Sequence, residues 1–393
     1  MHDMDVPLPS CSVRLRGALD LERTPAGWMP RRLPSWTRPQ LPDAFCEMVV
    51  SQPSGVRLVF GTEATSLELT VLITRTWFAG DPDAEPAGCF DLVVDGEPAG
   101  RVPAPDGGVL VLDLETGAVR RENGLPDVVR FGLPPGFKEV EIWLPQSSQV
   151  ELVDLRADAP VHPPEPGDRP VWIHHGSSIS HCADADGPLG SWPVVAARRA
   201  GVEVLNLGLG GNAMLDPFTA RTIRDLPADL ISLKLGINVV NGATMRLRAF
   251  VPAVHGFLDT VRDGHPDAPL LLVSPVACPI VETRPGPTGL VQGADGWRFT
   301  ASGDPADIAA DIAAGALSLT VIRDVLRGIA AERSDPNLHY LDGRELFGPA
   351  DVADLPDDLH PNAAGYRRMG ERFAAIAFAG DGPFSTALRS ADA

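Results

Sequence analysis

The sequence lacks several features that mark large classes of proteins. Its 393 residues include only five cysteines, an odd number with no CxxC pair, which argues against a disulfide framework or a structural zinc site and favours reduced thiols. It has no run of 18 apolar residues, and its first twenty residues show no basic stretch leading into an apolar one. We therefore expect no membrane span and no signal peptide, and a soluble, cytoplasmic protein.

Positive charge is also scarce. The 33 lysines and arginines are outnumbered by 52 aspartates and glutamates, so the net charge is −19. This charge repels phosphate backbones and anionic lipid surfaces, and no run of basic residues offers a local exception. We expect neither nucleic acid nor a membrane as a partner.

The first part of the chain has the pattern of a β-rich domain. Apolar and polar residues alternate, as at Leu67, Leu69 and Val71, and no convincing amphipathic helix occurs between Cys46 and Leu155. This indicates short antiparallel strands, so we expect a jelly-roll-like β-sandwich. Residues 1–40 are expected to cover it irregularly.

A stiff linker follows, because residues 156–170 contain five prolines. The expected domains are therefore 1–160 and 161–393.

Beyond the linker, apolar strands alternate with amphipathic stretches. The expected strands are 171–175, 203–207, 230–235, 270–275 and 339–342, and the expected helices are 192–201, 246–264, 311–332 and 362–378. Such alternation indicates an α/β domain with a parallel sheet and helices on both faces, and ligands then bind at the carboxyl ends of the strands. A Gly/Pro-rich insertion, residues 283–299, is expected to form a lid or rim over the site.

A serine and a histidine stand out at that edge. Ser178 follows the first strand of this domain, where the next helix begins, although a serine there is also the favoured N-cap residue. Asp357 precedes His360 by three residues, ahead of the last helix. A carboxylate that fixes one imidazole tautomer leaves the other nitrogen to take a proton from serine, as a Ser-His-Asp relay requires, although an acidic residue here could equally cap the helix.

Two further segments supply hydrogen-bond donors. NLGLGGN (206–212) follows the second strand, and its glycines allow a backbone amide to approach a reacting group. LGIN (235–238) follows the third and offers the side chain of Asn238. With the Ser178 amide they would form an oxyanion hole, in which each donor is worth about 3 kcal/mol.

The segments GSSI, NLGLGG, GIN and DDLHPN, in this order, resemble the four signature blocks of SGNH (GDSL-like) hydrolases over roughly residues 171–378. The resemblance implies a three-layer, flavodoxin-like α/β/α domain without a cofactor or a metal. It implies that Ser178 is the nucleophile and that Asp357 and His360 complete the relay. Ser178, Gly211 and Asn238 would form the oxyanion hole. Ser177 departs from the family motif, which has aspartate there.

The implied activity is that of a serine esterase. A carboxylic ester of a small molecule or carbohydrate, with a short acyl group such as acetyl, would be hydrolysed through an acyl-enzyme. The segment GCFDLVVDG (88–96) resembles the GxDLY-type signature of β-rich domains that precede some SGNH hydrolases, including carbohydrate esterases, but has one inserted residue and Val93 in place of tyrosine.

Other interpretations compete with this one. GLGGNA (208–213) satisfies a dinucleotide fingerprint, but a dehydrogenase also needs an acidic residue at the end of the next strand, and Asp229 lies before that strand. No GxSxG elbow or HExxH motif is present. A non-catalytic carbohydrate-binding protein on the same scaffold is a further alternative.

Several histidines and tryptophans near the predicted site invite a ligand-binding role. His174, His175 and His181 could be metal ligands, but neighbouring strand residues point to opposite faces, so we expect structural or substrate-contacting roles. Trp192 and Trp297 could stack on a sugar or line an acyl pocket, although a large aromatic is more often part of the core.

Overall fold

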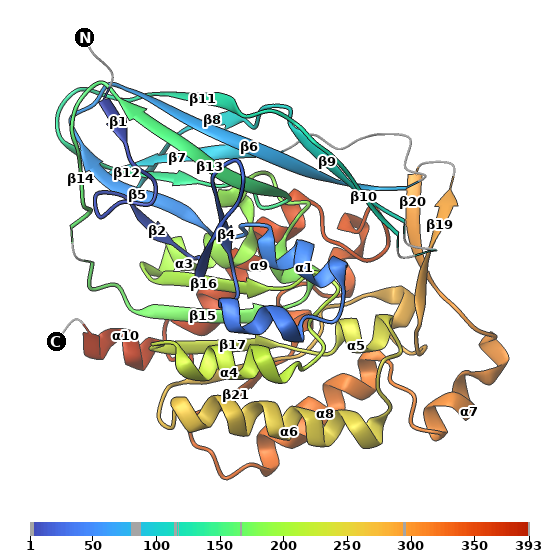
Figure 1. Ribbon diagram of the computed structural model, residues 1–393. Helices are drawn as coiled ribbons and strands as arrows, with labels where there is room; N and C mark the ends of the chain where they lie inside the picture. The colour runs from blue at the N-terminus through green and yellow to red at the C-terminus, as the bar shows by residue number, and fades with distance from the viewer. Residues whose placement is uncertain are drawn as a thin grey trace. The chain divides into compact units, whose positions relative to one another are not determined.

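The computed structural model describes residues 4–79, 88–113, 116, 118–165, 167–293 and 296–391 (Figure 1). The chain divides into two compact units. The first comprises Met1–Asp168 with Asp186–Leu189, and the second comprises Arg169–Ala185 with Gly190–Ala393. All five cysteines are free thiols, as the sequence predicts.

Two sheets build the first unit. The larger sheet contains β1 (Met4–Val6), β3 (Asp20–Arg23), β4 (Trp28–Arg31), β6 (Ser66–Phe78), β9 (Gly108–Leu112), β10 (Val119–Glu122), β11 (Asp127–Gly132) and β13 (Ser148–Ala157). The smaller contains β2 (Arg14–Arg16), β5 (Arg57–Thr62), β7 (Cys89–Val94), β8 (Glu97–Pro103), β12 (Lys138–Trp143) and β14 (Val161–His162). Among the described strands of these two sheets, pairing is antiparallel except between β6 and β9.

Alternating side chains from both sheets form one core, as expected for a β-sandwich. Leu67, Leu69 and Val71 of β6 are fully buried in it, together with Phe60 of β5 and Ile142 of β12. Every second residue of these strands therefore faces the opposite sheet.

Two details of this unit differ from the prediction. Helix α1 (Ala44–Ser51) extends beyond Cys46, into the stretch where no helix was expected. Asp43 caps it by accepting the backbone N–H of Cys46 at 2.8 Å. Residues 4–40 are not an irregular cover, because β1 to β4 pair with strands of both sheets.

The second unit contains a five-stranded parallel sheet. Its strands are β15 (Val171–Gly176), β16 (Glu203–Gly208), β17 (Leu230–Lys234), β18 (Leu270–Val273) and β21 (Leu338–Leu341), in the order β16-β15-β17-β18-β21. This is the flavodoxin-like order, in which the chain reverses direction across the sheet at β15. The predicted three-layer α/β/α domain is confirmed.

Helices cover both faces of this sheet (Figure 1). The described helices of this unit are α2 (Ser178–His181), α3 (Trp192–Ala200), α4 (Pro217–Asp225), α5 (Ile237–Asn241), α6 (Leu247–Gly264), α7 (Ile308–Ala313), α8 (Leu319–Glu332), α9 (Ala363–Phe373) and α10 (Ser385–Ala391). Helices α3 and α9 pack together on one face, and α4 and α6 pack together on the other. The predicted helix 311–332 is interrupted between α7 and α8.

The position of Asp229 bears on the dinucleotide-binding alternative. At the amino edge, Asp229 accepts the backbone N–H of Val171 at 2.7 Å, so this carboxylate lies away from the glycine-rich loop that follows β16. The dinucleotide-binding alternative therefore loses its ribose ligand.

Among the described helices, none is long and apolar enough to cross a membrane.

Candidate active site

Ser178 lies where the first strand of the parallel sheet passes into a helix. Strand β15 ends at Gly176, and Ser177 caps the short helix α2, its hydroxyl accepting the backbone N–H of Ile179 at 3.3 Å. Serine and aspartate are comparable N-cap residues, so Ser177 can replace the aspartate of the family motif as a cap. Ser178 is the first helical residue, and the N–H of such a residue has no acceptor within the helix.

Asn206 holds this helix against the neighbouring strand. Its Nδ2 donates to the backbone carbonyl of Ser180 at 2.9 Å, and its Oδ1 accepts the N–H of Gly208 at 2.9 Å. A Cβ added to Gly208 would lie 2.4 Å from the backbone nitrogen of His181, so the close approach requires glycine here. Asn206 belongs to the predicted NLGLGGN block, but nothing in the sequence distinguishes it from its neighbours there.

The structure brings Asp357 and His360 together with Ser178. His360 Nδ1 lies 2.6 Å from Asp357 Oδ2, and His360 Nε2 lies 2.9 Å from Ser178 Oγ. Because a carboxylate only accepts hydrogen bonds, Nδ1 carries the proton and Nε2 can accept the serine hydroxyl. The three groups therefore form a continuous hydrogen-bonded chain.

A tight turn sets the direction of this pair. Asp357 Oδ1 accepts the backbone N–H groups of Leu359 at 2.9 Å and His360 at 2.7 Å. Asp358 adopts a φ of 67°, in the left-handed region that aspartate tolerates better than most residues. The turn folds the imidazole back onto the carboxylate three residues earlier.

The carboxylate changes the acidity of the imidazole. Burial alone would lower the pKa of His360, but the hydrogen bond and charge of Asp357, together with the charge of Asp184, raise it above its ordinary value of 6.5. Burial raises the pKa of Asp357, yet the hydrogen bond and charge of His360 bring it below its ordinary value. Asp357 therefore stays ionised and stabilises an imidazolium at His360.

The two predicted donor segments meet beside Ser178. Gly211 has a φ of 68°, and a Cβ added to the preceding Gly210 would lie 3.7 Å from the Cβ of Ser178. Asn238, only 4% exposed, accepts the N–H of Ala213 with its Oδ1 at 3.0 Å. This bond joins the segments and orients Asn238 so that Nδ2 is its remaining donor.

His174 and His175 serve the scaffold on opposite faces of the sheet. His174 is fully buried, with Nδ1 at 2.7 Å from Ser232 Oγ and Nε2 at 2.8 Å from Ser180 Oγ. Burial lowers the pKa of His174 well below its ordinary value, so it is neutral. His175 instead stacks on Phe257 of α6. Within the described residues, no group of three or more acidic, histidine or cysteine side chains could hold a metal ion.

Trp192 belongs to the core and not to a substrate pocket. It is fully buried, stands edge-on to His174 with ring centroids 4.6 Å apart, and donates from Nε1 to the carbonyl of Ile179 at 2.9 Å. It therefore holds the short helix that carries Ser178 through this hydrogen bond.

The insertion supplies a contact that the sequence did not assign to a residue. Phe299 stands edge-on to the imidazole of His360, with ring centroids 5.5 Å apart. Its backbone N–H donates to the carbonyl of Asp357 at 2.9 Å. Residues 294–295 of the insertion lie outside the described residues.

Comparison with known families agrees with this geometry. Residues 175–368 match the model of the GDSL-like Lipase/Acylhydrolase family. The chain contains a GDSL-like hydrolase domain. The predicted family and the predicted class of enzyme, a carboxylic ester hydrolase, are both confirmed. No curated protein matches the chain.

Solved structures extend the likeness to both units. The salicylyl-acyltransferase SsfX3 from a tetracycline biosynthetic pathway is 28% identical with a TM-score of 0.77, and the match covers 94% of this chain and 95% of that one. A putative GDSL-like lipase from Bacteroides ovatus is 17% identical with a TM-score of 0.66, covering 95% and 96%. A family two carbohydrate esterase from Clostridium thermocellum is 15% identical with a TM-score of 0.53, covering 82% and 90%. The last two show the fold alone.

Proposed function

We propose that this GDSL-like hydrolase is a serine esterase that works through an acyl-enzyme on Ser178. The observation that carries the proposal is the chain of hydrogen bonds from Asp357 through His360 to Ser178 Oγ, of 2.6 and 2.9 Å. A serine hydroxyl is a weak nucleophile by itself, and a neutral imidazole within hydrogen-bond reach activates it.

In the first half of the reaction, Ser178 Oγ attacks the carbonyl carbon of the ester while its proton passes to His360 Nε2. The negative charge of the tetrahedral intermediate develops on the carbonyl oxygen. The backbone amides of Ser178 and Gly211 and the Nδ2 of Asn238 are the proposed donors to that oxygen. The intermediate collapses when the C–O bond to the alcohol breaks, and His360 returns its proton to the departing alkoxide.

In the second half, water takes the place of the alcohol. His360 accepts a proton from the water as its oxygen attacks the acyl carbon, and it then protonates Ser178 Oγ as the acyl-enzyme bond breaks. The products are a carboxylic acid and the free enzyme. The chemistry needs no cofactor and no metal, so the proposed partner is the ester alone, a small-molecule or carbohydrate ester with a short acyl group such as acetyl.

Transfer of the acyl group to an alcohol is a second candidate function. It is favoured by the likeness to an acyltransferase, SsfX3, along 94% of this chain. The acyl-enzyme is common to both reactions, and they differ only in whether water or an alcohol attacks it.

The test combines covalent labelling with hydrolysis of a short-chain aryl ester. A fluorophosphonate should modify Ser178, and the Ser178→Ala variant should lose both labelling and hydrolysis, with a fall in kcat of about 10⁴-fold or more. Ser180→Ala is the matched control, because Ser180 is in the same short helix but its hydroxyl contacts His174. It should keep most of the activity.

Two results would contradict the proposal. If the Ser178→Ala variant hydrolysed the ester at the full rate, Ser178 would not be the nucleophile. Failure of the natural chain to react with the fluorophosphonate or to cleave any ester would instead favour the non-catalytic carbohydrate-binding alternative.

A further inference from the structure

The insertion forms a two-stranded hairpin with two unlike faces. Its strands are β19 (Thr288–Gly293) and β20 (Gly296–Ala301), and their register places Leu290 opposite Phe299 and Gln292 opposite Trp297. Directly opposed residues share a face, and alternate residues of one strand do as well. Leu290, Trp297 and Phe299 therefore lie on one face of the hairpin, which we call the aromatic face.

The other face carries different chemistry. Val291 is opposite Arg298 there and is 47% exposed. Arg298 is the only charged side chain among the described residues of the two strands, and it lies 3.4 Å from the carboxylate of Asp358. The aromatic face is thus uncharged along the described part of the hairpin.

The aromatic face borders the proposed general base. Phe299 contacts the His360 ring edge-on, and its N–H donates to the carbonyl of Asp357. Since His360 Nε2 lies 2.9 Å from Ser178 Oγ, this face begins one imidazole ring away from the nucleophile.

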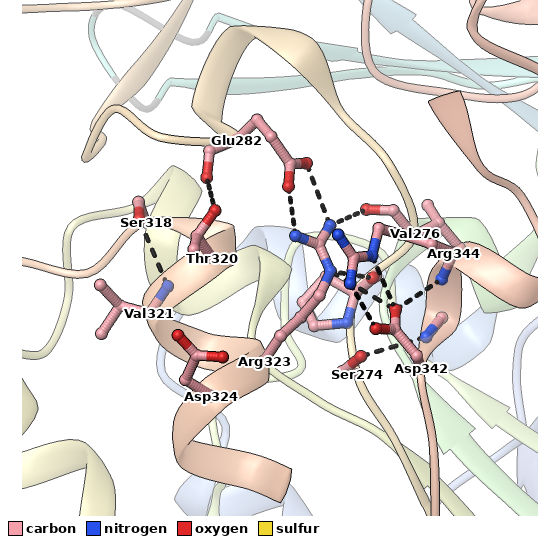
Figure 2. A network of polar contacts seen from close by, with 12 residues as sticks. Ser274, Val276, Glu282, Ser318, Thr320, Val321, Arg323, Asp324, Asp342 and Arg344 are labelled. Carbon is pink, nitrogen blue, oxygen red and sulfur yellow. Dashed lines mark hydrogen bonds and ion pairs between the residues drawn. The ribbon is translucent and has the colours of Figure 1, made fainter. Parts of the chain in front are cut away.

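A buried arginine fixes the base of the hairpin (Figure 2). Arg323 of α8, 2% exposed, donates to the carbonyl of Val276 at 3.0 Å and to the carboxylate of Glu282 at 3.0 Å. Thr320 donates to the carbonyl of Glu282 from its hydroxyl at 2.8 Å and from its backbone N–H at 3.0 Å. The chain therefore leaves the sheet for the hairpin from an anchored point.

The segment that leads into the hairpin lies against the helix that carries the proposed oxyanion donor. A Cβ added to Gly286 would lie 1.9 Å from the carbonyl oxygen of Val240 in α5, so the backbones are in close contact there. A face anchored at Glu282, Gly286 and Phe299 is preorganised to bind a ligand.

The chemistry of ester cleavage decides which part of the substrate meets this face. The carbonyl oxygen must point to the donors at Gly211 and Asn238, whereas the alcohol oxygen must lie within reach of His360 Nε2, which protonates it. The alcohol part of the ester is therefore on the side of His360, next to Phe299. We propose that the aromatic face, formed by Leu290, Trp297 and Phe299, binds the alcohol part of the substrate and selects an alcohol built on a flat, uncharged aromatic ring.

The inference rests on the proposed function and extends it to the second substrate of a transfer reaction. An alcohol that enters occupies the same place as one that leaves. His360 takes the proton of the entering hydroxyl as its oxygen bonds to the acyl carbon, the bond to Ser178 Oγ breaks, and the proton passes to Ser178. An aromatic alcohol held on this face competes with water for the acyl-enzyme.

The experiment compares three esters in the full-length protein. Phenyl acetate and hexafluoroisopropyl acetate have leaving alcohols of similar acidity, but only the first carries a ring on the alcohol side. Hexafluoroisopropyl benzoate moves the ring to the acyl side. The variants are Trp297→Ala in β20 and Leu290→Ala in β19. The matched control is Val291→Ala, which lies in β19 but on the opposite face of the hairpin.

Loss of Trp297 should lower kcat/KM for phenyl acetate by about 2- to 10-fold, as expected for one aromatic contact. It should leave hexafluoroisopropyl acetate within about 2-fold of its original value. Leu290→Ala should act in the same direction, and Val291→Ala should change neither ester. Added benzyl alcohol should yield benzyl acetate with the natural chain and less of it with Trp297→Ala.

The outcomes separate this inference from the proposed function. Equal losses on both acetates, or no loss on either, would overturn the inference while the esterase stands. A loss confined to the benzoate would assign the face to the acyl group and would also overturn it. If Ser178 takes no label and no ester is cleaved, the proposed function and the inference fail together.

Discussion

Asn206 and Ser180 are joined by a hydrogen bond of 2.9 Å, from a strand side chain to the backbone of the helix that carries Ser178. Helix α2 spans only four residues, too few to hold its position by its own hydrogen bonds. The position of the proposed nucleophile therefore depends on contacts from the neighbouring strand.

Replacing Asn206 by alanine should weaken both fold and activity. The carbonyl of Ser180 and the N–H of Gly208 would each lose a hydrogen bond to a fully buried side chain. An intramolecular hydrogen bond contributes about 0.5–1.5 kcal/mol to stability. Urea unfolding should show the loss of stability, and kcat on an aryl ester should fall at temperatures where the variant remains folded. Unchanged values of both would mean that α2 is held by other contacts.

Gly208→Ala should affect the same helix by steric contact. The new Cβ would lie 2.4 Å from the His181 nitrogen, and backbone cannot move away as a flexible side chain would. We expect a fall in kcat of about 10²-fold, since misplacement of a reacting group by 1 Å costs that much. Gly328→Ala in α8 is the control, because nothing lies within 4 Å of its added Cβ and alanine favours a helix. Its steady-state kinetics should match those of the natural chain.

Ser177 offers a test of the departure from the family motif. Ser177→Asp restores the aspartate and still provides an oxygen to accept the N–H of Ile179, so kcat should stay within about 3-fold of its original value. Ser177→Ala removes the cap and should lower the free energy of unfolding by about 0.5–2 kcal/mol. Thermal unfolding and ester hydrolysis of the two variants measure both effects. A larger loss of activity with aspartate than with alanine would contradict this role.

The raised pKa of His360 predicts a pH profile. His360 acts as a base only when neutral, so kcat/KM should rise with pH through a pKa above the ordinary 6.5. In Asp357→Asn the imidazolium loses its hydrogen-bonded carboxylate, so this pKa should fall and the acid limb should move to lower pH. The plateau should drop by about 10²- to 10⁴-fold, because the imidazole is no longer held in the correct tautomer.

Asp184→Asn is the matched control for that experiment. The charge of Asp184 also raises the pKa of His360, but Asp184 is not among the residues hydrogen-bonded to the imidazole. The acid limb should therefore move to lower pH while the plateau is retained. If Asp357→Asn left the limb in place, the carboxylate would not control the base.

His360 and His174 make stability depend on pH in opposite directions. His360 has a raised pKa in the folded protein, so it contributes stability that is complete below the unfolded value and is lost as pH rises through the folded value. His174 has a lowered pKa, so its contribution is present above the unfolded value and is lost as pH falls towards the folded one. The two histidines therefore partly offset each other in acid.

The parallel sheet was predictable because its strands are buried on both faces. Runs such as LLLV at 270–273 are continuously apolar, which is typical of a strand covered by helices on both sides. Strands β1 to β4 escaped prediction because they are three or four residues long and contain Pro30 and several arginines. Short segments of this kind become strands only when longer ones offer a partner.

In the site, too, local contacts could be predicted from the sequence, whereas contacts between distant segments could not. Asp357 and His360 were recognisable because they are three residues apart and their contact is local. The contact of Phe299 with His360 joins segments about sixty residues apart, and that of Asn206 with Ser180 crosses between neighbouring elements. The core position of Trp192 likewise depends on Trp172, His174 and Phe373, which come from other elements. Such contacts leave no periodic trace in the sequence.

The turn from Asp357 to His360 closes on itself through three hydrogen bonds. The orientation of the imidazole relative to its carboxylate is therefore set within four consecutive residues, and the turn is a self-contained unit in this respect. The segments on either side can then change length or composition during evolution while the pair keeps its internal geometry. If the turn were transplanted onto another scaffold, the design would need to place the imidazole within reach of a serine, because the turn itself already orients the imidazole on its carboxylate.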